Sequence, residues 1–359
     1  MGSGAAMTTT QKAAFAAIVA LTAAAGAAHY LAAPAVLSFV LATFALAGLA
    51  WVVSFATEQV GSRKGPAVTG LLQSTLGNLP EFFVVVFALR AGQTVVAETS
   101  IVGSFFANAL LVLGLVVIVG ARRETDGVMR FSPKLPRDTV TLLLPAVMLV
   151  VLIGISIASS DKASHHVTGL SVVGALALLA VYTRWLPGYL RGEGRVTDEA
   201  ATELGVHHLG YALSIALLVL GAVGAAFVSD WFVAALQPAI DKLHISETFA
   251  GLIVVAIAGN AVENTAGITL AAKGKADLAI SVVKNSVSQV IVFLYPALIL
   301  VSLLFRHQLT FALSPTLIGA LVLTTLALWQ ITGDGEAAEF EGWALVALFV
   351  VLATLALYE

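Results

Sequence analysis

Apolar residues fill long stretches of the chain, and only short polar connections separate them. A helix that crosses a bilayer needs about 20 predominantly apolar residues, and this length divides the chain into about eleven such segments. The expected spans lie near residues 13–29, 35–57, 66–90, 94–120, 139–159, 167–189, 208–230, 246–272, 277–304, 313–332 and 343–358. The pattern therefore predicts an all-α polytopic membrane protein.

The longest polar stretches, residues 122–138 and 191–204, divide this pattern, and the second lies near the middle of the 359 residues. The Gly/Ser/Ala-rich start of the chain, Met1 to Ala6, resembles a vector-derived remnant and is set aside from the fold argument. We expect a remnant and tail at 1–11, an extra first helix at 12–33, a five-helix repeat at 34–190, a cytoplasmic linker at 191–206 and a second five-helix repeat at 207–359.

Composition narrows the class of protein. Hydrophobic residues make up 59% of the chain and charged residues 11%, and the mean hydropathy is +0.98, which is far from the balance of a soluble domain. The net charge of −3 is dispersed without a basic patch, which argues against a nucleic-acid partner. The absence of cysteine excludes disulfides and thiolate metal sites. The sequence has no nucleotide-binding loop or catalytic triad spacing, so we expect neither an enzyme nor a bound cofactor.

The loops predict an orientation, because Lys and Arg collect on the cytoplasmic side of membrane proteins. Four basic loop residues lie on one side: Arg90, Lys162, Lys242 and Arg306. Twelve lie on the other: Lys12, Arg63, Lys64, Arg122, Arg123, Arg130, Lys134, Arg137, Arg191, Arg195, Lys273 and Lys275. We therefore expect a cytoplasmic N-terminus and an outside C-terminus, and the compactness of the chain favours a prokaryotic plasma (inner) membrane.

Two short blocks place a carboxylate inside an apolar stretch. They are Gly77-Asn78-Leu79-Pro80-Glu81 and Gly259-Asn260-Ala261-Val262-Glu263, which lie 182 positions apart (259 − 77). The predicted orientation makes the two carrying spans run in opposite directions, as in inverted repeats. A carboxylate near the bilayer centre costs on the order of 3 kcal/mol, so a matching pair indicates a functional site. Many secondary transporters have this arrangement of repeats.

The blocks contain the ligands of a hard cation. Gly and Pro loosen a membrane helix, and the backbone carbonyls that they free need a partner. Asn78 and Glu81 lie three positions apart on one helical face, as do Asn260 and Glu263. Carbonyl, amide and carboxylate oxygens are the ligands that Ca2+ prefers, with six to eight in its shell. We therefore predict that Glu81 and Glu263 bind a metal ion.

The span after each block adds polar residues at helical spacing. They are Ser100, Ser104 and Asn108 in the first half, and Asn285, Ser288 and Gln289 in the second. We interpret them as further walls of one site. The alternative is that these small polar residues join helices to one another, as such residues commonly do in membranes, but this does not account for the two carboxylates.

The charge of the two carboxylates favours exchange of ions. A charge of −2 is balanced by one divalent cation or by two protons. Without metal, two close carboxylates repel and a low dielectric favours their protonation, whereas Ca2+ would hold both ionised. If only the neutralised forms rearrange across the membrane, this competition becomes antiport.

These residues resemble a known family, the CAX-type calcium/proton exchangers of the cation/calcium exchanger superfamily. In the first half the resemblance covers Thr57 to Val60, Gly70 to Leu72, Gly77 to Glu81, Phe87 to Leu89, and Gly103 to Gly114. In the second half it covers Ser246 to Val254, Gly259 to Glu263, Asp277 to Ala279, Gln289 to Phe293, Asp334-Gly335 and Glu341-Gly342.

The resemblance implies eleven helices, inverted repeats and Ca2+ extrusion driven by proton entry. By position, it implies that Glu81 and Glu263 bind Ca2+ and protons in turn. It also implies that Asn78 and Asn260 flank them, that Asn108 and Gln289 complete the site, and that Glu58 belongs to an entry path. For Glu58, a charge at a helix end among the lipid headgroups is an equal alternative.

Several positions depart from the family pattern. Leu79-Pro80 stands where the family has Ala-Thr, Asn264 where it has His, and Asn285-Ser286-Val287 where it has Gly-Ser-Ser. Lys284 lies inside the ninth expected span, where we expect it to snorkel or to join helices. Because of these departures, the sequence does not fix which ions the protein transports. The alternatives are Mn2+ as cargo, Na+ or K+ as the driving ion, and a passive cation channel.

Overall fold

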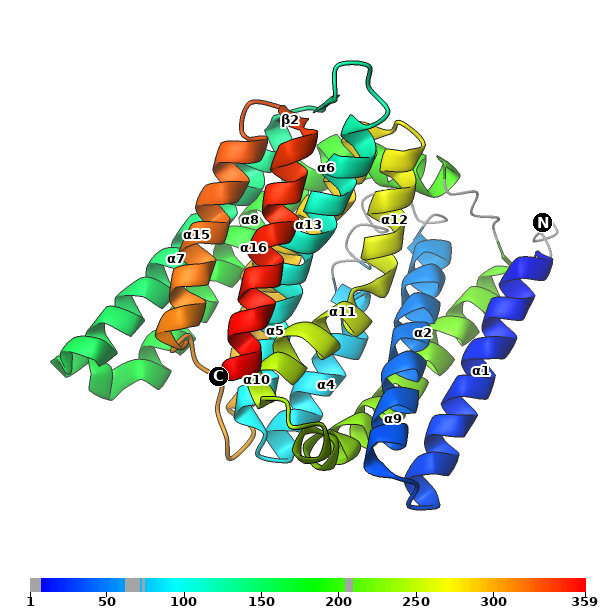
Figure 1. Ribbon diagram of the computed structural model, residues 1–359, viewed down its shortest axis with the longest axis vertical. Coiled ribbons are helices and arrows are strands. Elements are labelled where there is room, and N and C mark those ends of the chain that lie inside the picture. Colours follow the sequence, from blue (N-terminus) through cyan, green and yellow to red (C-terminus); the bar gives the residue numbers. More distant parts are fainter. Residues whose placement is uncertain (1–7, 62–71, 73–74, 204–208) are drawn as a thin grey trace.

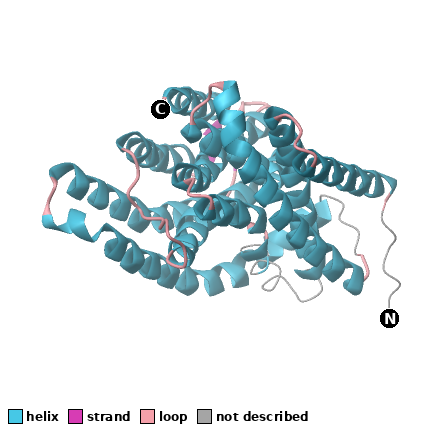
Figure 2. Cartoon of the chain, turned by 90° about the horizontal axis from the view of Figure 1, so that it is seen from below, coloured by secondary structure: helices cyan, strands magenta, loops and turns pink. Residues whose placement is uncertain are grey.

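The computed structural model describes residues 8–61, 72, 75–203 and 209–359, apart from the side chains of 135, 190–203 and 261–264. Helices form nearly all of it, packed side by side (Figures 1 and 2). The first half contains α1 (Thr9–Tyr30), α2 (Ala35–Gly61), α4 (Leu79–Arg90), α5 (Thr94–Phe106), η1 (Ala107–Val112), α6 (Leu113–Ala121), β1 (Val128–Arg130), α7 (Lys134–Ser159), η2 (Lys162–His166) and α8 (Val167–Glu203).

The second half starts with α9 (Tyr211–Leu243) and has the same mixture of long and interrupted helices. It continues with α10 (Glu247–Phe249), η3 (Ala250–Val255), α11 (Ala256–Gly259), α12 (Ala261–Ala272), α13 (Ala276–Gln289), η4 (Val290–Leu294), α14 (Tyr295–Ser302), α15 (Pro315–Thr332), β2 (Glu336–Ala338) and α16 (Glu339–Tyr358). Among the described residues, nine continuous helical segments are long and apolar enough to cross a membrane, so the predicted class of fold is confirmed.

Nine of the expected spans coincide with these segments. The other two are the spans that carry the Gly-Asn blocks, and the structure describes each of them as shorter pieces. Of the expected span 66–90, residues 66–71, 73 and 74 lie outside the described residues, as does Gly70 of the family motif. The expected span 246–272 breaks at Asn260, between α11 and α12. The count of eleven therefore stays a prediction.

The two breaks have the same backbone geometry. Asn78, before α4, has φ −92° and ψ 15°, and Asn260, before α12, has φ −96° and ψ 16°. Both lie in the sparsely populated bridge region, where active-site residues are often found. Pro80 stands in the first turn of α4, where a missing amide proton costs nothing.

The likeness of the two halves continues beyond the breaks. Both α4 and α12 have 12 residues, and both end before a glycine with positive φ, 80° at Gly92 and 75° at Gly274. Each is followed by a helix that ends in a π-helical segment, η1 in the first half and η4 in the second. Figure 1 shows α4 running from the middle of the molecule to its lower end and α12 from the middle to its upper end. The two half-helices are therefore inverted relative to each other.

Burial separates a central layer from the lipid-facing helices. The span formed by α5, η1 and α6 is 89% buried, and the span of α13 and α14 is 72% buried, whereas α1 is 17% buried. Large apolar side chains such as Leu144, Met148 and Val173 are exposed on α7 and α8, as expected of surfaces that face acyl chains. The two Gly-Asn blocks therefore lie against the helices that are most shielded from lipid.

Two features were absent from the sequence prediction. Antiparallel strands β1 and β2, three residues each, pair the loop after α6 with the loop before α16. Arg122 and Glu339 form an ion pair of 2.8 Å beside them. Strands this short leave no readable alternation of polar and apolar residues. In addition, α8 extends to Glu203, so most of the expected linker is helical, since its Arg, Glu and Ala residues favour helix.

Close backbone crossings hold the buried helices together. In the crossing of α6 with α16, a Cβ atom added to Gly114 would lie 2.7 Å from the carbonyl oxygen of Gly342, and one added to Gly342 would lie 2.7 Å from that of Gly114. Small residues commonly permit such approaches between membrane helices. The Gly114–Gly342 pair therefore fixes the separation of these two helices.

We expect Gly114→Ala to destabilise the protein by about 1–3 kcal/mol, because the helices must move apart. Thermal unfolding of the purified protein in detergent measures this change. Gly319→Ala is the matched control, since an added Cβ at Gly319 in α15 meets nothing within 4 Å. Equal midpoints for the two variants would contradict the role given to this crossing.

Candidate functional site

The carboxylate of Glu81 lies at the centre of a buried polar network. Glu81 is in the first turn of α4, and 7% of the residue is exposed. Its Oε1 accepts hydrogen bonds from Ser104 Oγ at 2.7 Å and from Asn260 Nδ2 at 2.7 Å. The three residues come from α4, α5 and the break before α12, so the carboxylate is held jointly by the first and second halves of the chain.

Asn108 extends this network. Its Nδ2 donates to Asn260 Oδ1 at 2.6 Å and to the backbone oxygen of Ser104 at 3.0 Å. Asn260 Nδ2 in turn lies 2.9 Å from Ser104 Oγ and donates to the backbone oxygen of Ala256 at 2.8 Å. The amide dipoles thus align in series with their positive ends toward Glu81. Such chains of hydrogen bonds polarise one another in a low dielectric.

Gly259 forms a wall against the carboxylate. A Cβ added there would lie 2.9 Å from both Cγ and Oε1 of Glu81, so any side chain would displace the acid. The block of the second half therefore shapes the environment of the carboxylate in the first half. Its glycine is needed for a close approach as well as for the break in the helix.

A second close crossing brings Ser104 to Asn260. Helix α5 packs against η3, and an added Cβ on Gly103 would collide with the backbone of Leu252. On the opposite side, an added Cβ on Gly251 would lie 3.1 Å from the backbone oxygen of Val96. Because Gly103 directly precedes Ser104, this contact sets the position of the serine relative to the second half.

The start of helix α4 favours a negative charge on Glu81. Glu81 is the third residue of α4, and the N-terminal end of a helix carries a partial positive charge. Glu263 is likewise the third residue of α12. The side chain of Glu263 lies outside the described residues, so its contact with Glu81 stays a prediction.

Two amide atoms near Glu81 are buried without a hydrogen-bond partner in the described part of the chain. They are Asn108 Oδ1 and Asn78 Nδ2. A buried polar atom without a partner costs about 1–3 kcal/mol, so native structures rarely retain one without a use. The oxygen of Asn108 has the chemistry of a cation ligand.

The second-half residues on α13 lie in two environments. Gln289 is 5% exposed and precedes the π-helical segment η4, and Oδ1 of Asn285 has no partner among the described atoms. Ser288 instead donates to Thr139 Oγ1 of α7 at 3.2 Å and to the backbone oxygen of Lys284 at 3.0 Å. The network around Glu81 does not include Ser288 in this structure.

Lys284 joins two helices. It is fully buried in α13, and its Nζ donates to Thr332 Oγ1 of α15 at 3.0 Å. The interhelical alternative of our prediction therefore describes this side chain, whereas a fully buried ammonium is not snorkelling. None of the hydrogen bonds described for Lys284 is with Glu81.

Three further predicted residues, Gly77, Glu58 and Ser100, belong to the first half of the chain. Gly77 forms the turn before Asn78, Glu58 is a half-buried residue of α2, and Ser100 donates to the backbone oxygen of Ala97 in its own helix. In the described part of the chain, no group of three or more His, Cys, Asp or Glu side chains could hold a metal ion. The described site thus combines one carboxylate with neutral amides and a hydroxyl.

Sequence reasoning missed the π-helical segments next to the site. Asn108 lies inside η1, and η4 follows Gln289 directly. A π-helical turn widens the helix by one residue, and such turns are frequent at functional sites. No local signal in the residues separates them from α-helix. Their mirrored occurrence after Ser104 and Ser288 becomes visible only with coordinates.

Comparisons with known proteins agree on one family. The model of the family described as sodium/calcium exchanger protein matches residues 34–186 and 213–358. The chain is 31% identical over 324 residues to the vacuolar calcium ion transporter of Schizosaccharomyces pombe, covering 88% of this chain and 77% of that protein. It is 29% identical over 345 residues to the Ca(2+)/H(+) antiporter of Synechocystis, covering 91% and 92%.

Solved structures have the same fold. Native YfkE superposes with a TM-score of 0.81 at 25% identity, covering 96% of this chain and 100% of that one. The H+/Ca2+ exchanger CAX superposes with a TM-score of 0.71 at 17% identity, covering 98% and 93%. The two segments matched by the family model fall within the two expected halves of the chain.

We expect Ser104→Ala to lower the free energy of unfolding by about 1–2 kcal/mol, because it removes a buried donor to Glu81. Ser100→Ala is the matched control, one turn earlier on α5, where the hydroxyl bonds only within its own helix among the described contacts. Chemical or thermal unfolding in detergent compares them. Indistinguishable stabilities would show that the Ser104–Glu81 hydrogen bond contributes little.

Proposed function

Because the chain belongs to the sodium/calcium exchanger protein family, we propose that it is a secondary active antiporter that exchanges Ca2+ for H+ by alternating access. It is an integral membrane protein, and the resemblance to this superfamily is confirmed. The observation that carries the proposal is the buried Glu81 carboxylate, held by Ser104 of its own half and Asn260 of the other. Relatives named as Ca(2+)/H(+) antiporters support the choice of ions.

In the proposed mechanism, Glu81 and Glu263 bind either one Ca2+ or protons. The amide oxygens of Asn108 and Asn260, the hydroxyl of Ser104 and the backbone oxygens freed at the two breaks supply further oxygen ligands of the kind that Ca2+ prefers. Asn78, Asn285 and Gln289 complete the site from the remaining walls. Glu58 belongs to an entry path.

Hydrogen-bond donors explain how the carboxylate can change partners. Ser104 and Asn260 donate to Oε1 of Glu81 and thereby stabilise its ionised form. Both side chains also carry an oxygen, so a rotation of either one replaces a donor by a ligand. Protonation of the acid and binding of Ca2+ are then alternative ways to balance the same charge.

Coupling follows from the cost of an unbalanced charge. A site that holds neither Ca2+ nor protons carries −2 in a low dielectric, and moving it between the two faces of the membrane is unfavourable. Each neutralised form can rearrange. The contacts of Gly259 and Asn260 with Glu81 mean that this rearrangement must shift the two halves relative to each other.

The alternatives differ in what drives the flux. A Na+- or K+-driven exchanger of the same superfamily would use the same carboxylates, and Mn2+ would use the same ligands. A passive channel needs a continuous path, whereas an acid enclosed by Ser104, Asn260 and Gly259 favours an occluded carrier site.

We place the protein in a prokaryotic plasma membrane, with the N-terminus and the basic loops in the cytoplasm.

We expect Glu81→Gln and Glu263→Gln each to reduce ΔpH-driven 45Ca2+ uptake into proteoliposomes to background, because the amide keeps the size and removes the charge. Glu98→Gln is the matched control. Glu98 is a carboxylate of α5, the helix that follows α4, and it takes no part in the hydrogen bonds described around Glu81. Undiminished flux in both Gln variants would refute the proposal.

Imposing one gradient at a time identifies the driving ion. We expect a proton gradient alone to drive accumulation of 45Ca2+, and Na+ or K+ gradients at constant pH to drive none. A requirement for Na+ would select the alternative exchanger.

Acceleration of 45Ca2+ entry by unlabelled Ca2+ inside the vesicles separates a carrier from a channel, since only a carrier exchanges one bound ion for another.

A further inference from the structure

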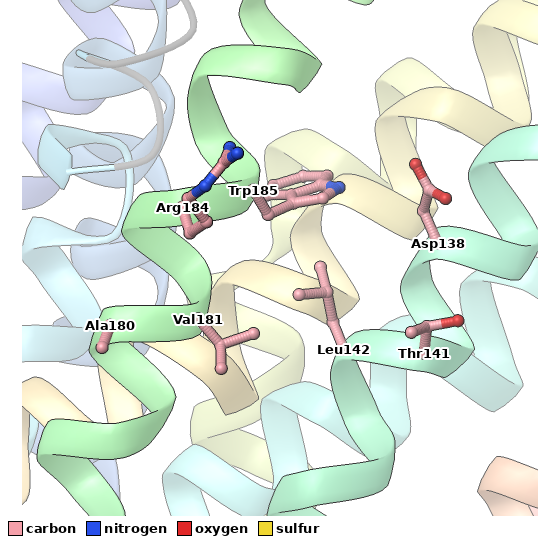
Figure 3. Close-up of a pocket in the computed structure, with 7 residues that line it drawn as sticks. All are labelled: Asp138, Thr141, Leu142, Ala180, Val181, Arg184 and Trp185. Atoms are coloured by element: carbon pink, nitrogen blue, oxygen red, sulfur yellow. The ribbon is translucent and has the colours of Figure 1, made fainter.

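A groove between α7 and α8 has a lining that includes none of the residues of the network around Glu81. Its volume is about 510 Å³. Its lining residues are Asp138, Thr141 and Leu142 from α7 and Ala180, Val181, Arg184 and Trp185 from α8 (Figure 3). The described spans Pro136–Ser159 and Lys162–Tyr189, which contain most of α7 and the first part of α8, are 33% and 28% buried and so expose much of their surface to lipid. The groove therefore opens toward the bilayer.

The depth of the groove corresponds to the lipid headgroup region. Asp138 is the third residue of the span Pro136–Ser159, and Arg184 is the sixth from the end of the span Lys162–Tyr189. Both charges therefore lie near a membrane surface, on the side where the basic loops collect. Trp185 stacks on Tyr189 with ring centroids 4.7 Å apart, and such aromatic residues are typical of that depth.

The groove carries one positive and one negative side chain that do not pair with each other. Figure 3 shows Trp185 extending from α8 toward α7, with Arg184 on one side of its ring and Asp138 on the other. Among the described residues, neither charge takes part in an ion pair within 4.0 Å. The lining is thus neutral overall, with its two charges on opposite walls.

Apolar surface continues from the groove toward the middle of the membrane. Leu144 and Met148 follow Thr141 on one face of α7 and are 56% and 64% exposed. Val173 and Leu176 precede Ala180 on one face of α8 and are 67% and 55% exposed. A molecule seated in the groove would therefore have a charged end beside Trp185 and an apolar end along both helices.

We propose that this groove binds a zwitterionic phospholipid with an ethanolamine headgroup. Arg184 contacts the phosphate, to which a guanidinium donates in a fixed fork geometry. Asp138 accepts hydrogen bonds from the primary ammonium, and the acyl chains lie along the exposed faces of α7 and α8. The proposal concerns a lipid site and does not depend on which ions the protein transports.

The charges select this headgroup over two others. A glycerol headgroup leaves the lipid anionic and gives Asp138 no cation. A choline headgroup carries a cation without N–H donors, so the carboxylate of Asp138 cannot form hydrogen bonds with it. Of these three headgroups, ethanolamine alone supplies both an anion for Arg184 and a hydrogen-bonding cation for Asp138.

Quenching of Trp185 fluorescence by brominated lipids tests the site directly. The probe protein keeps Trp185 and has Phe at the other four tryptophans, Trp51, Trp231, Trp329 and Trp343. Vesicles contain phosphatidylethanolamine, phosphatidylcholine and phosphatidylglycerol, with one of the three brominated at a time. We expect Trp185 to select the ethanolamine lipid about threefold over choline, the size expected of one partly exposed ion pair.

Trp329 provides the matched control. It is 61% exposed on α15, and a protein that keeps Trp329 alone reports on lipid at an ordinary helix surface. We expect it to be quenched equally by the three lipids. Equal quenching of Trp185 by the three lipids would overturn the proposal.

Three substitutions separate the roles of the charges. Asp138→Asn should abolish the preference for ethanolamine over choline, and Arg184→Gln should weaken binding of all three lipids about equally. Asp138→Lys should turn the preference toward phosphatidylglycerol. Native mass spectrometry of the protein with all tryptophans present measures the same ratios if the single-tryptophan protein is unstable. Unchanged ratios in Asp138→Asn and Asp138→Lys would refute the assignment.

Discussion

The structure depends on the compensation of a carboxylate inside the membrane. Lipid supplies no hydrogen bonds, so the protein must provide them or the acid must carry a proton or a cation. Around Glu81, Ser104 and Asn260 donate hydrogen bonds, Gly259 makes room, and the helix end adds a favourable dipole. Each of these features requires a break in a helix or a close crossing of two helices. The buried central layer of α5 and α13 shields the carboxylate from lipid.

The sequence predicted the fold well where length and hydropathy decide the structure. The nine continuous spans follow from apolar stretches, and the break at Asn260 follows from glycine and asparagine in such a stretch. The short β1–β2 pair and the helical continuation of α8 to Glu203 were missed. Both lie in polar segments, where short-range preferences are weak and distant contacts decide the outcome.

Part of the predicted set of site residues meets in the structure, and the role of these residues in ion binding stays a prediction. Polar residues are rare in apolar spans and usually have a function there, which is why the sequence pointed to these positions. The described hydrogen bonds join four of them: Glu81, Ser104, Asn108 and Asn260. The described hydrogen bonds of Ser288 are to Thr139 and to its own helix, so its place in the site stays a prediction. The π-helical turns and the approach of Gly259 to an acid 178 positions earlier (259 − 81) depend on tertiary packing, which spacing along one helix does not contain.

The contact of Gly259 and Asn260 with Glu81 has a consequence for the history of the chain. The acid of one half is completed by the polypeptide of the other, so a single half could not have formed this pocket alone. A half-length ancestor would have needed two copies inserted in opposite orientations in one membrane. After fusion, substitutions in one half would be constrained by their counterparts in the other, and the two halves would have to diverge together.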